Sequence, residues 1–252
     1  MLNPTNAALM RIKQEKPLVL NITNEVTMDF VANGLLSLGA SPIMSKAEQE
    51  IEDLLKLSKT VVINLGTLDE KFISLCHLTC RIANQLNKPI VLDPVGAGAS
   101  HYRTATCLSL IKDHRIAIIR GNASEIMALA GSTGLTKGVD SSAQSQEALE
   151  SAKLLSRRYQ GAVVVSGETD LIVDQDREEL LKHGSVLMPS ITGTGCLLSA
   201  VVAAFHAIEA DRFQAAVTAA LFYSLCGEKA ESLAQGPGTF RLHFLDVLYS
   251  PL

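Results

Sequence analysis

Short runs of apolar, mostly β-branched residues recur along the first two thirds of the chain, and each ends in polar residues or glycine. Runs of this length and composition are typical of buried strands. The pattern predicts strands at 17–21, 60–66, 89–95, 116–122 and 161–167. Because the runs are apolar almost throughout, rather than alternating, we expect both faces of each strand to be covered.

Segments with apolar residues at helical spacing separate most of these runs. Residues 28–40, for example, carry Phe30, Val31 and Leu35 on one side of a predicted helix. Similar patterns predict helices at 68–86 and 145–160. Alternating strands and helices predict an α/β fold, in which helices cover both faces of a mainly parallel central sheet.

The pattern changes after residue 167. Apolar runs at 170–175 and 184–189 flank a charged stretch, and we expect these runs to be late, partly antiparallel edge strands. Helical patterns then follow at 193–210, 213–234 and 240–248. Neither a linker nor an internal repeat interrupts the chain, so we expect one domain over residues 1–252.

Composition and charge exclude several classes of protein. The chain has 252 residues, 47% of them hydrophobic, which is enough for one substantial core. The net charge is −4 and no block of Lys and Arg stands out, which argues against nucleic-acid binding. The N-terminus lacks the apolar core of a signal peptide, and the longest apolar stretch, 197–208, is too short to span a membrane. We therefore expect a soluble, cytoplasmic protein.

The chain has five cysteines, an odd number that fits free thiols in a reducing compartment. Cys76 and Cys80 are one helical turn apart. A zinc site would need a second pair of ligands nearby, and the six histidines form no cluster. We therefore expect these two thiols to lie in the core.

Ligands of open α/β sheets bind beyond the carboxyl ends of the strands. Polar residues that end the apolar runs should therefore share one rim. They are Asn21, Asn24, residues 64–67, Asp93, residues 120–125, Ser166 and residues 193–196.

The sequence "GTGC" at 193–196 stands directly before a long apolar helix. Glycines allow tight turns, and the first amides of a helix attract anions, so Thr194 and Gly195 are candidates to bind one. An ordinary turn between strand and helix would have similar residues. Cys196 lies inside the same turn, where a thiol can act as a nucleophile, as a base or as a small residue facing the substrate. The residues alone leave these roles open.

Acidic residues follow two of the predicted strands. Asp93 ends one strand and is held extended by Pro94, which places it at the ligand crevice. Asn122 and Glu125 have the spacing of a helix cap, but a carboxylate at this rim could equally hold Mg²⁺, with Arg120 facing phosphate oxygens. The phosphate-binding pattern G-x-x-x-x-G-K-[ST] is not present, so the chain is not a P-loop enzyme.

Two residues near the first strand have similarly open roles. Asn24 follows that strand and could be a turn residue or a hydrogen-bonding partner of a small ligand. Met44 follows the next helix and could pack in the core or form an apolar wall against a ligand.

Taken together, the segments "NITNEVTMDFVANGLLSLGASPIMS", "LDPVGAGAS", "IIRGNASEI" and "MPSITGTGCLLSA" resemble the hydroxyethylthiazole kinase family of the ribokinase-like superfamily. The resemblance extends over essentially the whole chain. It implies a three-layer α/β/α fold and ATP- and Mg²⁺-dependent phosphorylation of 4-methyl-5-(2-hydroxyethyl)thiazole, in thiazole salvage for thiamine biosynthesis. It also implies a homotrimer with the thiazole pocket between subunits.

The resemblance assigns roles to individual residues. It places the substrate at Met44 and Gly193, and ATP at Arg120 and Ser166. The position of Asn24 at the rim, and that of Thr194 and Gly195 at the helix start, add Asn24 to the expected substrate contacts and Thr194 and Gly195 to the expected ATP contacts. Residues 122–125 match the superfamily motif N-x-x-E, which organises Mg²⁺ and phosphate, so Glu125 is expected at the metal with Asp93 as a second acidic group.

Related sugar and pyrimidine kinases usually have Asp where this chain has Cys196. Phosphoryl transfer depends mostly on positioning and electrostatics, so a poorer base can serve. We therefore expect Cys196 to be the catalytic residue beside the substrate hydroxyl, as a modest base or mainly as a shape element. The competing interpretations are a pyrimidine kinase or repair dehydratase of the same fold, a regulatory nucleotide-binding module, and a cysteine-dependent hydrolase.

Overall fold

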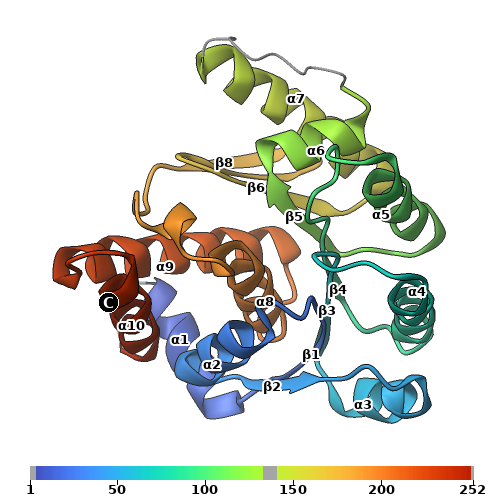
Figure 1. The fold of residues 1–252 in the computed structure, drawn as a ribbon, viewed down its shortest axis with the longest axis horizontal. Coiled ribbons are helices and arrows are strands. Elements are labelled where there is room, and N and C mark those ends of the chain that lie inside the picture. The colour runs from blue at the N-terminus through green and yellow to red at the C-terminus, as the bar shows by residue number, and fades with distance from the viewer. Residues whose placement is uncertain (1–3, 133–140, 251–252) are drawn as a thin grey trace.

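The computed structural model describes residues 4–132 and 141–250. Within them, eight strands form one sheet in the order β2-β1-β3-β4-β5-β6-β7-β8 (Figure 1). The strands are β1 Leu18–Ile22, β2 Ser41–Met44, β3 Thr60–Asn64, β4 Ile90–Asp93, β5 Ile118–Asn122, β6 Ala162–Ser166, β7 Asp170–Asp174 and β8 Arg177–Leu181. Neighbouring strands from β2 to β6 are parallel, whereas β6, β7 and β8 pair antiparallel.

Helices cover both faces of the sheet (Figure 1). They are α1 Pro4–Glu15, α2 Met28–Leu38, α3 Ile51–Leu57, α4 Glu70–Gln85, α5 His101–Asp113, α6 Ala123–Ala130, α7 Ser141–Tyr159, α8 Thr194–His206, α9 Arg212–Leu233 and α10 Pro237–Tyr249, with short 3₁₀ turns at Glu48–Glu50 and Met188–Ser190. The predicted α/β class with a mainly parallel central sheet is confirmed. Within the described residues, no helix is both long and apolar enough to cross a bilayer.

Two apolar cores lie on the two sides of the sheet. In β1, Val19 packs in the core under α1, α2, α8, α9 and α10, whereas Leu20 and Ile22 pack in the core under α3 to α7. Because successive strand side chains point to opposite faces, a strand buried on both sides must be apolar almost throughout. Cys76 and Cys80 lie buried on α4 in the second core, as predicted.

The five early strands and the strand at 170–175 occur close to their predicted positions. The prediction of a strand at 184–189 is wrong, because that segment is a loop that leads into the 3₁₀ turn. The last strand is instead the charged stretch Arg177–Leu181, in which four of five residues are exposed. An outermost strand with an exposed face needs no apolar run, so the pattern did not reveal it.

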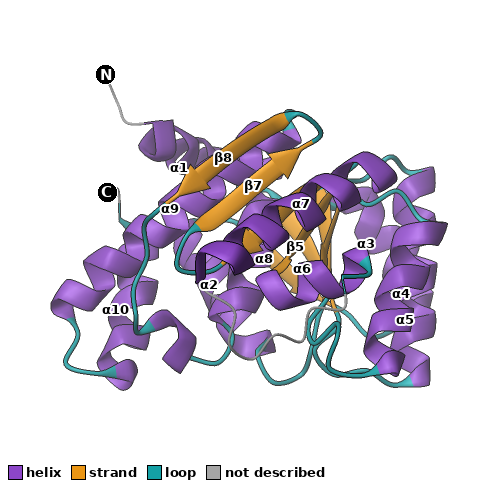
Figure 2. Cartoon of the chain, turned by 90° about the horizontal axis from the view of Figure 1, so that it is seen from above, coloured by secondary structure: helices purple, strands orange, loops and turns teal. Residues whose placement is uncertain are grey.

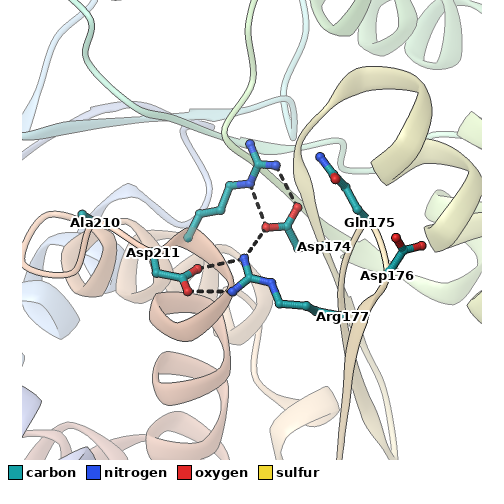
Figure 3. Close-up of a pocket in the computed structure, with 7 residues that line it drawn as sticks. Asp174, Gln175, Asp176, Arg177, Ala210 and Asp211 are labelled. Carbon is teal, nitrogen blue, oxygen red and sulfur yellow. Dashed lines mark hydrogen bonds and ion pairs between the residues drawn. The ribbon is translucent and has the colours of Figure 1, made fainter.

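The β7–β8 hairpin lies beside α9 (Figure 2) and is joined to its start by ion pairs (Figure 3). The buried carboxylate of Asp174 accepts hydrogen bonds at 2.8 Å from Arg212 Nη2 and at 2.8 Å from Arg177 Nη2. Arg177 also donates to both oxygens of Asp211, the N-cap residue of α9. Burial by itself would raise the pKa of Asp174. The hydrogen bonds and positive charges of Arg212 and Arg177 outweigh this effect and lower the pKa. These contacts tie the antiparallel edge of the sheet to α9.

Replacing Asp174 with asparagine should destabilise the fold by about 1–2 kcal/mol at pH 7, because both arginines lose a charged acceptor. A lowered carboxyl pKa stabilises the folded state above the ordinary pKa of 3.8, and that stabilisation is lost as the pH falls through the lowered value. The variant and the wild type should therefore converge in stability as the pH falls below the lowered pKa of Asp174. Urea unfolding at pH 7 and at a series of acidic pH values measures this, and a difference in stability that does not change with pH would contradict the ion-pair explanation.

Candidate active site

The carboxyl ends of β5 and β6 open into a cavity of about 770 Å³, which is bounded on its other sides by residues 182–189, the first turn of α8 and part of α9. Arg120, Ser166, Thr194 and Gly195 all line this cavity. These are the four predicted ATP contacts, drawn from three separate segments of the sequence. The structure therefore brings them together, and the cavity has the size of a ligand pocket.

Arg120 is the buried cation of this cavity. It is only 8% exposed, donates a hydrogen bond from Nη2 to Ser166 Oγ, and has Nη1 at 3.8 Å from Asp93 Oδ2. Its Nε is buried without a hydrogen-bond partner among the described residues. A Cβ atom placed on Gly195 would lie 2.8 Å from Arg120 Nη1. The guanidinium therefore lies directly against the first turn of α8, where anions are favoured.

The turn before α8 depends on its glycine. Gly193 is the N-cap residue and has φ +100°, a left-handed conformation that costs most other residues stability. Thr194 donates its hydroxyl to the carbonyls of Met188 and Ile191 at 3.0 and 3.2 Å, and its own carbonyl accepts from Tyr223. The Thr194 hydroxyl therefore holds the preceding loop, which leaves the helix amides as the donors towards an anion.

Asp93 ends β4 as predicted and is almost completely buried. Its Oδ2 accepts hydrogen bonds from Asn64 Nδ2 at 2.7 Å and from Ser199 Oγ at 2.8 Å. Burial raises the pKa of Asp93 to about 6, and the charge of Glu125 adds to the rise, against the opposing effect of Arg120. At neutral pH the carboxylate is therefore charged and held beside Arg120.

Glu125 closes the capping box that its spacing predicted. Its Oε2 accepts from Asn122 N at 2.8 Å, while Asn122 Oδ1 accepts from Glu125 N at 2.9 Å. Its Oε1 accepts from Gly96 N at 2.8 Å, which joins the turn after β4 to the start of α6. The capping role of Glu125 is confirmed, and its role at a metal stays a prediction.

Cys196 lies in the first turn of α8 and is half-buried. Asn24 Nδ2 is 3.3 Å from its Sγ. Burial raises the pKa of Cys196, the Asp93 carboxylate raises it further, and hydrogen bonds from Thr27, Asn64 and Asn24 oppose the rise only in part. The resting form is therefore the thiol. Because no hydrogen bond joins Cys196 to a histidine in residues 4–132 and 141–250, the hydrolase interpretation has no structural support.

Two of the predicted substrate residues lie at this turn, since Gly193 forms part of it and Asn24 lies next to Cys196. A Cβ atom on Gly193 would lie 3.1 Å from both Phe30 Cδ1 and Thr27 Cβ, so the turn packs against the start of α2. Asn24 is buried in the loop that precedes α2. Met44 ends the edge strand β2, half-buried, and packs against the core under α8. Met44 is not among the described residues that line the cavity of Arg120.

Two polar residues of this region, Ser199 and Asp170, were not predicted at the site. Ser199 binds Asp93, as does Asn64, which was predicted at the rim without a role. Asp170 lines the cavity with its carboxylate held by Gly167 N and Ser224 Oγ, both at 3.0 Å. Ser199 had a signal in the sequence, since it is a polar residue one turn after Cys196 on an apolar helix.

Comparison with known proteins decides between the remaining interpretations. A family model described as the Hydroxyethylthiazole kinase family matches residues 9–251. The chain belongs to this family. A hydroxyethylthiazole kinase from Desulfotalea psychrophila is 44% identical over 96% of this chain and 89% of its own length.

Solved structures agree with this membership. The structure of a hydroxyethylthiazole kinase protein from Pyrococcus horikoshii has a TM-score of 0.89 and 38% identity, over 97% of this chain and 92% of the other. A ribokinase-like superfamily protein from Enterococcus faecalis has a TM-score of 0.67 at 12% identity, over 100% of this chain and 99% of the other, which shows a shared fold only. The resemblance and the ribokinase-like fold are thereby confirmed, and the chain is an enzyme of the kinase class.

Proposed function

We propose that this chain, as a single domain over residues 1–252, transfers the γ-phosphoryl group of ATP to the hydroxyl of 4-methyl-5-(2-hydroxyethyl)thiazole, in thiazole salvage for thiamine biosynthesis. The observation that carries this proposal is the packing of Arg120 against Gly195 in a cavity shared with Ser166. That packing puts a buried cation and the amides of a helix N-terminus at one point, where a phosphate can meet both.

The chemistry of this site is mainly electrostatic. The substrate hydroxyl oxygen attacks the γ-phosphorus and releases its proton to water or to a phosphate oxygen, the bond to the bridging oxygen breaks, and ADP leaves with that electron pair. Arg120 and the first amides of α8 face charge that persists or grows on the phosphoryl oxygens. Because these groups are held by the fold before ATP binds, they need little rearrangement in the transition state.

The residues at the rim also fit a magnesium ion. Mg²⁺ is usually held by one or two carboxylates together with phosphate oxygens and waters, and Asp93 and Glu125 are two carboxylates close enough for one to raise the pKa of the other. No larger group of metal-binding side chains occurs in the described residues, so phosphate and water would supply the other ligands. When bound, the ion would neutralise charge on the phosphates. Asp93 and Glu125 would hold it while their other hydrogen bonds keep them in place.

The substrate hydroxyl would lie beside Cys196, with Asn24, Gly193 and Met44 around the thiazole ring. Met44 ends an edge strand, where a second copy of the chain can reach it, which supports an active site completed at the interface of a homotrimer. Sedimentation of the purified protein tests the trimer. We also place the enzyme in the cytoplasm, in keeping with its free thiols.

Replacing Cys196 with alanine should lower kcat by no more than about tenfold, because a protonated thiol is a poor base and a full general base contributes about 10²-fold or more. The shape of the kcat profile between about pH 6 and 8 should stay the same. Steady-state kinetics across this range measure both. A loss above about 100-fold would show that Cys196 is an essential proton acceptor.

One assay tests the proposed function directly. ATP consumption is followed with Mg²⁺ and the thiazole alcohol, with Mg²⁺ and the hydroxymethylpyrimidine alcohol, and with Mg²⁺ alone. We expect ADP to form at a substantial rate only with the thiazole alcohol, and the rate to vanish when EDTA removes the metal. Faster turnover of the pyrimidine, or turnover that needs no alcohol, would refute the proposal.

A further inference from the structure

Two asparagine side chains form a hydrogen-bonded path between Asp93 and Cys196. Asn64 donates from Nδ2 to Asp93 Oδ2 at 2.7 Å and accepts at Oδ1 from Asn24 Nδ2 at 2.7 Å. Asn24 Nδ2 in turn lies 3.3 Å from Cys196 Sγ. The path thus runs from a buried carboxylate at the end of β4 to the thiol at the start of α8.

Backbone donors fix the direction of both carboxamides. Asn24 Oδ1 accepts from Thr27 N at 3.0 Å, and Asn64 Oδ1 accepts from Gly66 N at 3.1 Å. A backbone N–H can only donate, so neither amide can be turned over without losing a bond. The nitrogen of Asn24 must therefore face Asn64 and Cys196, and the sulfur is the acceptor.

The surroundings leave these side chains no room to turn. Asn64 is fully buried and Asn24 is 3% exposed. A Cβ atom on Gly66 would lie between 2.7 and 2.9 Å from the side-chain atoms of Asn24, so the turn after β3 presses directly on that carboxamide. Arg103 holds this turn from outside by donating to the carbonyls of Leu65 and Gly66 at 2.8 and 2.9 Å.

We propose that Asn64 is a positioning residue for the phosphoryl transfer, in that it holds the Asn24 carboxamide with an N–H directed at Cys196 Sγ. This inference rests on the proposed function, and it adds to that function a residue that touches neither ATP nor the thiazole. An N–H directed at sulfur fixes the place of the thiol beside the substrate hydroxyl and stabilises any negative charge that develops on it.

The effect of Asn64 on the pKa of Cys196 can be measured in the protein without any substrate. Cys196 is half-buried and the other four cysteines are fully buried, so their thiols ionise only at much higher pH. The ultraviolet absorbance of the thiolate, titrated against pH with Cys196→Ala as the blank, therefore reports the pKa of Cys196. Asn64→Ala should raise this pKa by about one unit, because the hydrogen bond that favours the thiolate is weakened.

A matched control lies on the same strand. Thr60 is a buried polar residue at the other end of β3, and its hydroxyl donates to Ala203 O of α8 at 3.1 Å. Thr60→Val loses a buried hydrogen bond to the same helix but should leave the Cys196 titration unchanged. In an Asn24→Ala background, Asn64→Ala should shift the pKa of Cys196 less than it does in the wild type, because the part of its effect that passes through Asn24 is already lost and only its own interaction with the thiol remains.

Kinetics give a second readout. Asn64→Ala should lower kcat about three- to tenfold, no more than Cys196→Ala does, while the KM for ATP stays within about twofold.

An unchanged Cys196 titration in the folded Asn64→Ala protein would overturn the inference. Asn64→Ser, which keeps a hydroxyl beside Gly66, replaces the alanine variant if that protein does not fold. If the wild type does not phosphorylate the thiazole alcohol, the proposed function fails, and the titration still decides whether Asn64 controls the thiol.

Discussion

Replacement of Arg120 by methionine is expected to lower kcat/KM for thiazole phosphorylation by about 10³-fold. Methionine keeps much of the length of the side chain but removes the buried cation that lies against Gly195 and bonds Ser166. The charge on the transferring phosphoryl group then loses its main partner from the protein. Coupled detection of ADP with the thiazole alcohol measures the loss.

Two further variants test whether the loss of activity comes from the guanidinium of Arg120 in particular. Arg120→Lys keeps the charge but not the planar fork of donors, so its activity should fall between those of the wild type and Arg120→Met. Arg115→Met changes an exposed arginine whose guanidinium donates to Asn84 and Asn87, far from the cavity, and it should be as active as the wild type. If Arg120→Met kept more than about a tenth of the wild-type kcat/KM, Arg120 could not be the phosphate contact.

Gly195→Ala should lower kcat/KM by about 10²-fold without removing any charge. The added methyl would lie 2.8 Å from Arg120 Nη1 and 3.3 Å from Nη2, so the guanidinium must move out of the place where it meets the helix amides. Only the end of one side chain has to shift, so the free energy of unfolding should change by less than about 1 kcal/mol. The KM for ATP should rise together with the fall in kcat.

A second glycine supplies the control for this variant. A Cβ atom on Gly238, in the first turn of α10, would meet nothing within 4 Å. Gly238→Ala should therefore have wild-type kinetics and stability. Equal activity of Gly195→Ala and Gly238→Ala would show that the space beside Arg120 is not used in catalysis.

The central strands of the sheet could be predicted from the sequence, because strands buried on both faces are apolar almost throughout. β3 and β6 are apolar for this reason, and the polar residues that end them had to converge at one rim. The edge strands are less buried, so their residues need not be apolar. β2 has four half-buried residues and includes Pro42, while β8 is mostly exposed, so neither has the composition of a buried strand.

The site could be predicted only as a set of candidates. Arg120, Ser166 and Gly195 share a cavity because strand ends and helix starts meet there. The contacts among side chains followed no local rule. Asn24 bonds Asn64, 40 residues later, and Cys196, 172 residues later, and no periodicity relates these positions. No local pattern predicted the orientation of Thr194 either, whose hydroxyl donates to the preceding loop rather than into the cavity.

The position of α8 has a consequence for how the protein is made. This helix packs on β1, β3 and β4, strands that leave the ribosome at least 100 residues before it. During translation, the apolar face that Leu197 and Val201 later cover stays open on the nascent chain. Such a surface is prone to aggregation, so folding of this chain should depend on chaperones until its last quarter has been synthesised.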